Sequence, residues 1–320
     1  MTLISPETRQ EVPDLTVARL SLRDEREKRS AALGSMGAAV FLTTIKLVAG
    51  FATGSLGILS EAAHSGLDLV AAVATWLAVR ASSRPPDQRH TYGHGKIENL
   101  SALVETALLL VTCLWIIAEA VERLFLKHVV VEVSVWSFAI MLVSIVVDLT
   151  RSRALARAAV AFNSPALEAD ALHFSTDVWS STVVIMGLVG VVLASRPGLG
   201  WLLNADAVAA LGVALIVVWI SIRLGRKTVA DLMDEVPPGM REEVARAARV
   251  SGVAGVDRVR VRRAGPNAFV DLAITVDRSS SIEDAHAIAS AAEAAVRRRF
   301  PAADVVVHVE PSPDAAYHEP

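Results

Sequence analysis

The stretch Asp170-Ala-Leu-His173-Phe-Ser-Thr-Asp177 stands at the head of a long apolar run, residues 178–194. His173 and Asp177 are four residues apart and Asp170 is three residues before His173, so a helix would carry all three on one face. An apolar run of this kind is typical of a membrane span. Because ionisable groups in a membrane helix are costly unless they serve a purpose, the stretch predicts a functional site inside a helical membrane domain.

A second stretch repeats this pattern earlier in the chain. Glu61-Ala-Ala-His64-Ser-Gly-Leu-Asp68 also places an acid, a histidine and an aspartate at helical spacing at the head of an apolar run. Two such helices packed side by side would direct a pair of imidazoles and a pair of carboxylates to one point. This set of nitrogen and oxygen ligands suits a tetrahedral divalent ion, above all Zn²⁺. The predicted ligands are His64, Asp68, His173 and Asp177.

The composition is that of a membrane protein that carries a soluble part. The chain has 320 residues, of which 53% are hydrophobic and 20% are charged, and its mean hydropathy is +0.46. The net charge of −3 leaves no global basic field that would attract nucleic acid. The single cysteine, Cys113, excludes a disulfide within the chain and is interpreted as a buried packing residue.

Several apolar segments are each long enough to cross a hydrocarbon core of about 30 Å. The polar N-terminus has no signal-peptide pattern, so we expect the first of these spans to be retained. The third and fourth spans contain acidic residues, among them Glu105 and Asp148. The six predicted spans are residues 31–53, 56–80, 99–121, 132–156, 169–194 and 203–224.

Lysine and arginine residues near the span ends predict the orientation in the membrane. They are numerous on the side that would hold both termini and the loops after the second and fourth spans, and Arg151 is counted among them. The opposite side has fewer, namely Arg123, Lys127 and Arg196. Both termini are therefore predicted to be cytoplasmic.

The composition changes after residue 228, where Pro237-Pro238-Gly239 breaks the chain. Helical spacing follows over residues 240–250, and alternation then predicts strands at 256–262 and 269–276. An amphipathic helix over 282–300 and a third strand at 304–309 complete the segment. The order α-β-β-α-β predicts a small sheet with helices on one face.

After its first residues the chain resembles the cation diffusion facilitator family of divalent-metal/proton antiporters. The resemblance rests on Ser55-Leu-Gly-Ile-Leu-Ser-Glu61-Ala-Ala-His64-Ser-Gly-Leu-Asp68, on Pro86-Asp87-Gln-Arg-His90-Thr-Tyr92-Gly93-His94-Gly95-Lys96-Ile-Glu98, on residues 170–177 and on the α-β-β-α-β segment. It implies a homodimer in the lipid bilayer with six transmembrane helices per protomer and a cytosolic α+β domain like a metallochaperone or ferredoxin. The expected division is an N-terminal cytosolic tail (1–29), a transmembrane transport domain (30–227), a metallochaperone-like dimerisation domain (228–311) and a disordered tail (312–320).

The resemblance implies the same intramembrane ligands, taken from the second and fifth spans. Glu61 and Asp170, one turn before the histidines, are interpreted as groups that support the ligands or line the path of the ion, with solvation of a helix end as the alternative. By resemblance, Asp87, His90 and His94 form a second site on the cytoplasmic side, and a solvated loop is the alternative.

The resemblance also implies a charge pair and a set of candidate metal ligands in the C-terminal domain. Lys96 matches a position that pairs with an acid near the end of the sixth span, here Asp234, and such a charge pair would hold helices together. In the C-terminal domain the residues that bind metal in the family are only partly kept, so either one metal ion binds weakly or the domain dimerises by packing alone. The candidate ligands there are His286, His308, Glu310 and Asp257.

Together these features predict a Zn²⁺/H⁺ antiporter that exports the metal from the cytosol by alternating access. There are two alternatives. One is a transporter of the same fold that carries mainly Fe²⁺, Co²⁺, Cd²⁺ or Mn²⁺, and the other is a membrane metal sensor that transports nothing. An enzyme is not expected, because four protein ligands leave no open position for an activated water molecule. The expected partners are a second copy of the chain, lipid, divalent metal ions and protons, with no nucleic acid, and the expected location is a bacterial inner membrane.

Overall fold

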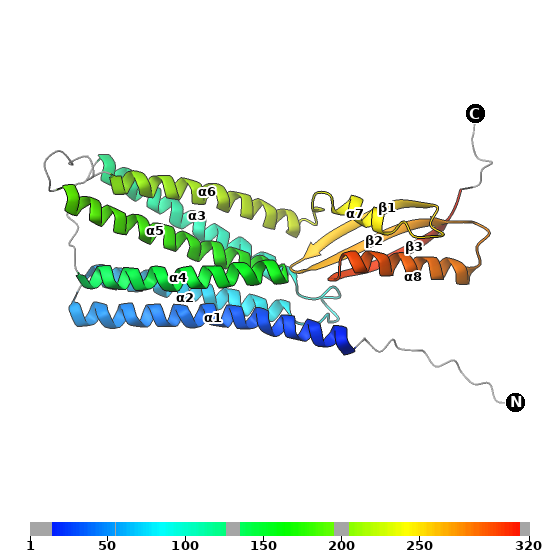
Figure 1. Cartoon of the computed structure of the whole chain (residues 1–320), viewed down its shortest axis with the longest axis horizontal. Helices are drawn as coiled ribbons and strands as arrows, with labels where there is room; N and C mark the ends of the chain where they lie inside the picture. Colours follow the sequence, from blue (N-terminus) through cyan, green and yellow to red (C-terminus); the bar gives the residue numbers. More distant parts are fainter. Residues whose placement is uncertain (1–14, 55, 126–134, 195–204, 314–320) are drawn as a thin grey trace.

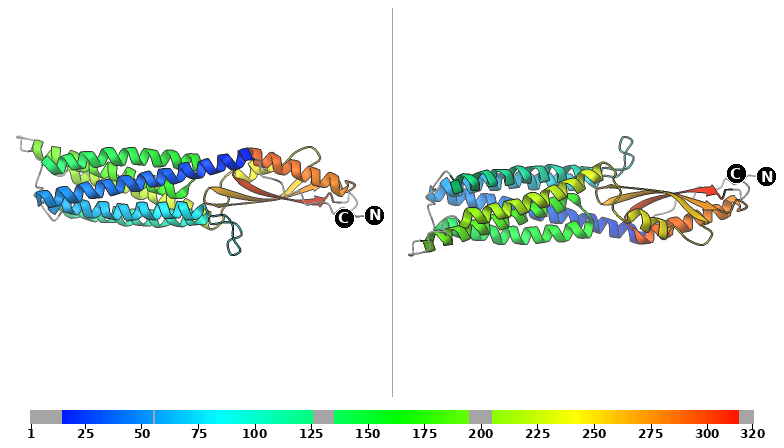
Figure 2. Two further views of the ribbon diagram at one scale, coloured as in Figure 1. Left: turned by 90° about the horizontal axis from the view of Figure 1, so that it is seen from below. Right: turned by 90° about the horizontal axis from the view of Figure 1, so that it is seen from above.

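A bundle of long helices followed by a small α+β domain makes up the part of the chain that the computed structural model describes, residues 15–54, 56–125, 135–194 and 205–313. The bundle helices run side by side along the longest axis, and the α+β domain lies beyond one end of the bundle (Figures 1 and 2). The predicted fold class, a helical membrane domain with a C-terminal α+β domain, is confirmed. The bundle helices are α1 (Leu15–Thr53), α2 (Leu56–Ser82), α3 (Lys96–Phe125), α4 (Val135–Phe162), α5 (Pro165–Ala194) and α6 (Ala205–Leu232).

Most bundle helices extend past the predicted spans toward the α+β domain. Helix α1 begins at Leu15, although the first span was predicted from residue 31, and α6 continues to Leu232. An apolar segment reports the thickness of the hydrocarbon core, whereas a helix continues as long as its backbone hydrogen bonds do. Residues 15–29 of the predicted tail are therefore helical, whereas 1–14 and 314–320, the rest of both predicted tails, lie outside the described residues.

The outer surface of the bundle is apolar. Large side chains point away from it, with Phe51 75% exposed, Trp115 73% and Trp219 64%. Such a surface fits lipid, where every backbone polar group is satisfied inside the helix. Among the described residues, three segments are long and apolar enough by themselves to cross a membrane: Glu25–Ala52, Glu61–Ser82 and Lys96–Ala118.

The interior is made by helices that pack in pairs, α1 with α2, α3 with α6 and α4 with α5. Helix α5 also contacts α2, α3 and α6, so it runs through the middle of the bundle. The contact between α2 and α5 brings together the two stretches that carry the repeated motif. Cys113 lies fully buried between α3 and α6 beside Leu109 and Val217, which confirms its predicted packing role.

A buried acid ties the bundle together at the end nearest the α+β domain. Glu98 on α3 has no exposed surface, and its carboxylate accepts hydrogen bonds from Lys28 on α1, from Ser82 on α2 and from Ser164 in the turn between α4 and α5. Lys28 itself is 3% exposed. A buried charge is tolerated when it is paired and fully hydrogen-bonded, as Glu98 is.

The α+β domain has the predicted order α-β-β-α-β. Its strands form one sheet in the order β1-β2-β3, in which β1 pairs antiparallel and β3 pairs parallel with the central β2. The core lies between this sheet and its helices, and β2 contributes Val270, Leu272 and Ile274, all buried. Ser281 caps α8 by accepting a hydrogen bond from the amide of Asp284. The elements are α7 (Met240–Ala247), β1 (Gly255–Ala264), β2 (Asn267–Val276), α8 (Ile282–Arg299) and β3 (Ala303–Pro311).

The turn between β1 and β2 docks on the start of α3. The backbone amide of Gly265 donates a hydrogen bond of 2.7 Å to Asn99 Oδ1. Gly95 approaches the same turn so closely that an added Cβ would overlap the carbonyl oxygen of Ala264, which only glycine permits. Lys96 Nζ lies 2.9 Å from Asp234 Oδ1, as predicted for this pair.

Candidate metal centres

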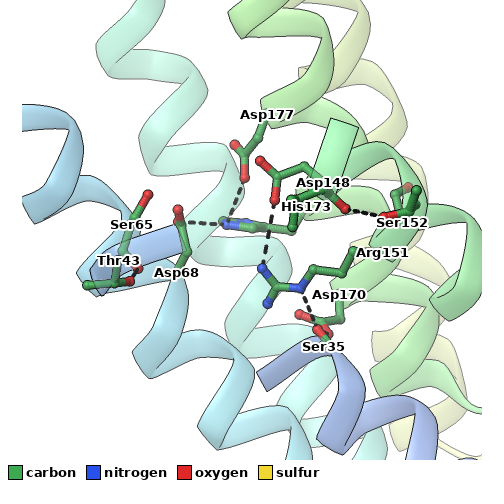
Figure 3. A network of polar contacts seen from close by, with 12 residues as sticks. Ser35, Thr43, Ser65, Asp68, Asp148, Arg151, Ser152, Asp170, His173 and Asp177 are labelled. Carbon is green, nitrogen blue, oxygen red and sulfur yellow. Dashed lines mark hydrogen bonds and ion pairs between the residues drawn. The ribbon is translucent and has the colours of Figure 1, made fainter. Parts of the chain in front are cut away.

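Asp68 on α2 meets His173 and Asp177 on α5 in the interior of the bundle (Figure 3). His173 Nε2 lies 3.2 Å from Asp68 Oδ1 and 3.7 Å from Asp177 Oδ2. One nitrogen or oxygen atom of each residue lies within 4.8 Å of the others, close enough for all three to bind one ion after a small adjustment. The fold thus brings together residues that are more than a hundred positions apart in the sequence.

His64, the fourth predicted ligand, is half-buried on α2 and does not belong to this group of atoms. It precedes Asp68 by one helical turn, and side chains at this spacing are about 5–6 Å apart at Cβ. His64 remains within electrostatic range of the carboxylates of Asp68 and Asp177. The structure therefore gathers three of the four predicted residues at one point and leaves His64 one turn farther from the α+β domain.

The two acids that precede the histidines have different surroundings. The side chain of Glu61 is half-exposed and accepts a hydrogen bond of 3.2 Å from Lys46, whose ammonium group also donates to Ser65 Oγ at 2.8 Å. Asp170 is buried, and its Oδ2 accepts a hydrogen bond of 3.0 Å from Ser35. Solvation of a helix end therefore does not describe Asp170, which lies inside the bundle.

Two charged residues of α4 also face the interior, and neither was predicted from the sequence to belong to the site. Arg151 was counted among the cations near the cytoplasmic end of the fourth predicted span, but α4 continues to Phe162 and places Arg151 inside the bundle, where it is 5% exposed. Asp148 is 8% exposed one turn earlier. The available signal was their spacing, because residues three apart lie on one helix face.

The loop between α2 and α3 brings together the side chains of Asp87, His90 and His94, the residues of the second predicted site. The carboxylate of Asp87 lies 3.2 Å from His90 Nδ1 and 3.4 Å from His94 Nε2. Backbone amides of His90 and Arg89 donate hydrogen bonds to this carboxylate and hold the pKa of Asp87 below its usual value, so it is ionised at neutral pH. Gly93, at φ 77°, lets the loop turn back on itself.

The candidate ligands of the C-terminal domain do not gather within one protomer. His308 and Glu310 project from the same face of β3 with 3.8 Å between Nε2 and Oε1. Asp257 instead accepts a hydrogen bond from Thr275, and His286 is exposed on α8. Among the described residues, the groups of three or more metal-ligand side chains are the bundle set and the loop set.

A bundle of membrane-length helices with ligand-type side chains in its interior, followed by an α+β domain, defines a membrane transport protein for metal cations. The chain matches the family model of the cation efflux transmembrane domain over residues 33–233. It also matches the model of the cytoplasmic domain of cation efflux proteins over residues 238–312. The chain therefore belongs to the cation diffusion facilitator family, whose members are cation efflux transporters and not enzymes.

Two cation-efflux pumps are similar to the chain along most of its length and agree with this assignment. The chain is 30% identical over 287 residues to the cation-efflux pump FieF of Salmonella arizonae and 31% identical over 288 residues to that of Klebsiella pneumoniae subsp. pneumoniae. Each match covers 88% of this chain and 92% of the relative. A solved variant of the MamM CTD is 36% identical with a TM-score of 0.22 and covers 22% of this chain and 91% of that chain. The protein is thus a divalent metal cation efflux transporter with a dimerising cytoplasmic domain.

Proposed function

We propose that the protein is a Zn²⁺/H⁺ antiporter and that Asp68, His173 and Asp177 bind the transported ion together with His64. The observation that carries the proposal is the convergence of the first three side chains inside the bundle, with one ligand atom from each within 4.8 Å of the others. A ligand set of two imidazoles and two carboxylates would be tetrahedral and would offset the charge of a divalent ion. Unprotonated ligands bind metal, so loading releases protons and unloading takes them up again.

Flux into proteoliposomes tests the function. With an imposed pH gradient, we expect Zn²⁺ to accumulate in vesicles that contain the protein, and we expect a protonophore that collapses the gradient to stop the accumulation. Metal binding without flux would instead favour a sensor. Flux of Zn²⁺ that is independent of the pH gradient would contradict the antiport. Parallel assays with Fe²⁺, Co²⁺, Cd²⁺ and Mn²⁺ rank the substrates, and Mn²⁺, the hardest of these ions, is expected to compete least with Zn²⁺ because nitrogen ligands favour Zn²⁺ over it.

His64→Asp tests the fourth ligand through selectivity. The substitution removes a nitrogen donor, so we expect the preference for Zn²⁺ over Mn²⁺ to fall by about tenfold while transport continues. The measurement is competition between the two ions in the flux assay. His64→Asn is the matched control, because it also removes the imidazole but adds no carboxylate, and it should lower transport of both ions. Unchanged competition in His64→Asp would remove His64 from the ligand set.

We also propose that Asp87, His90 and His94 form a cytoplasmic-side metal site. Its support is the short distances of the ionised Asp87 to both imidazoles. In addition, His94 Nδ1 is buried and has no hydrogen-bond partner among the described residues, which calls for a ligand or a proton acceptor. The candidate ligands of the C-terminal domain would need a second protomer to complete a metal site.

We further propose how the chain is divided and placed. Residues 1–29 form an N-terminal tail, 30–227 the transport domain, 228–311 the dimerisation domain and 312–320 a C-terminal tail. Both termini are cytoplasmic, and the membrane is a bacterial inner membrane.

The loop site predicts a specific binding defect. A variant with His90→Ala and His94→Ala should bind one Zn²⁺ fewer per protomer, because a lone carboxylate does not retain the ion. Equilibrium dialysis of the purified full-length protein measures this number. Arg89→Ala is the control within the same loop, since its side chain is not part of the cluster. An unchanged number of bound ions in the double variant would show that the loop is only solvated.

A further inference from the structure

Helix α4 contributes charged groups to the compartment of the bundle that holds the proposed ligands. Asp148 and Arg151 lie on the same face of the helix, with 3.8 Å between Asp148 Oδ1 and Arg151 Nη1. Both are buried, as is Asp170 on α5, which is 1% exposed. A buried ionisable group within a membrane bundle is a candidate for function together with its partners. Arg151 is of special interest because an arginine side chain keeps its positive charge in proteins.

The contacts of Arg151 hold its guanidinium in one place. Nε donates a hydrogen bond of 2.7 Å to Ser35 Oγ on α1, and the hydroxyl of Ser35 donates in turn to Asp170 Oδ2 at 3.0 Å. The guanidinium carbon lies 3.3 Å from the ring centre of Phe174 on α5, a distance typical of a cation stacked on an aromatic face. Three helices therefore fix this positive charge.

Arg151 is a close neighbour of the proposed transport site. Phe174, on which the guanidinium stacks, follows His173 in the chain, and the two rings meet edge to face with 5.1 Å between centroids. Figure 3 shows Arg151 directly beside the group formed by Asp68, His173 and Asp177. The hydrogen-bonding capacity of the cluster is not exhausted, because Arg151 Nη2 and Asp170 Oδ1 are buried without a hydrogen-bond partner among the described residues. The carboxyl groups within electrostatic range of Arg151 are those of Asp170, Asp148, Asp68 and Asp177, together with that of Glu105, which is buried on α3.

We propose that Arg151 is a fixed cation of the transport compartment, a positioning residue that anchors Asp148 and Asp170 and lowers the affinity of the neighbouring site for its divalent substrate. The inference rests on the proposed transport site. The carboxylates gathered around it would bind a dication very tightly in surroundings of low dielectric constant. A transporter must also release its ion, so binding has to stay weak enough for the ion to leave. A permanent positive charge beside the site repels the divalent ion and so keeps its binding weak enough for release.

Equilibrium binding of Zn²⁺ to the purified full-length dimer tests the proposal. The transport-site component is the part of the binding that His173→Ala removes. In Arg151→Gln, we expect the dissociation constant of this component to fall by about tenfold or more, because a repelling charge is lost. In Arg151→Lys, which keeps the charge, it should stay within about threefold of the parent. Arg153→Gln, an exposed arginine of the same helix, is the control and should leave binding unchanged.

Transport kinetics supply a second readout. Tighter binding should lower both KM and turnover of Arg151→Gln in the flux assay, whereas a merely structural arginine would lower turnover without lowering KM. Arg151→Met serves as an apolar variant of similar size. The proposal would be overturned if Arg151→Gln or Arg151→Met bound Zn²⁺ at this site with a dissociation constant equal to or higher than that of the parent. Loss of folding in both variants would also overturn it. If His173→Ala removes no binding, the proposed transport site fails instead, which keeps the two failures distinct.

Discussion

Replacing His173 with alanine is expected to abolish Zn²⁺ transport while the protein still folds and dimerises. The imidazole lies 3.2 Å from Asp68 and 3.7 Å from Asp177, so it is the side chain that joins the ligands of α2 and α5. Even a residue that only supports a ligand changes metal affinity or activity by about 10–100-fold, and the loss of a ligand itself should exceed this. The initial rate of Zn²⁺ uptake into proteoliposomes measures the effect.

Folding of this variant is expected to persist because the contacts of His173 are few. Its hydrogen bond to Asp68 and its edge-to-face contact with Phe174 each contribute about 1 kcal/mol to stability, which is small against the burial of the whole bundle. Size-exclusion chromatography and the Tm of the purified protein should therefore match those of the parent closely. The control is Thr182→Ala on the same helix, whose hydroxyl donates a hydrogen bond of 2.7 Å to the carbonyl of Val178. Uptake at the parental rate in His173→Ala would refute the assignment of the site.

Replacing Glu98 with alanine is expected to cause a large loss of stability. Glu98 is fully buried and accepts hydrogen bonds from Lys28, Ser82 and Ser164, which belong to different segments of the bundle. Its removal leaves the ammonium group of Lys28 buried without an anion, and breaking a buried pair in this way costs about 3–5 kcal/mol. Thermal unfolding of the purified dimer should show a fall in Tm of about 10 °C or more.

Two comparisons separate this effect from a general sensitivity of the bundle to lost charge. Combining Glu98→Ala with Lys28→Met removes both charges, so we expect part of the stability to return. Glu168→Ala breaks an exposed pair with Lys227 at 2.7 Å, and exposed pairs contribute only about 0–1 kcal/mol. If Glu98→Ala and Glu168→Ala lowered Tm equally, the central role of Glu98 would be disproved.

Local patterns in the sequence were enough for much of the fold. Apolar segments at the length of a bilayer predicted the helical bundle, and alternation after Pro237-Pro238-Gly239 predicted β1 and β2. The end of each helix was less predictable, as at Leu15 and Leu232. Hydrophobicity stops where the lipid stops, whereas the polar part of α1 contacts α3 through Lys28 and Glu98, and that of α6 contacts α5 through Lys227 and Glu168.

Contacts between distant segments were the part that local patterns missed. Arg151 was interpreted as a cation near the cytoplasmic end of a span, because a count of charges near span ends does not show which way a side chain points. In the structure its guanidinium is held by Ser35 and Phe174, which belong to two other helices. The anchoring of Lys28 by Glu98 was missed for the same reason.

The sequence alone determined which residue types stand at helical spacing, and with them the pairs His64 with Asp68 and His173 with Asp177, since spacing is a property of a single helix. The tertiary structure alone decided that Asp68 joins His173 and Asp177 while His64 stands one turn away, and that Arg151 lies beside them. The physical reason is that the axial level at which α2, α4 and α5 pack is set by side-chain contacts along their whole length. No pattern within one helix specifies that level.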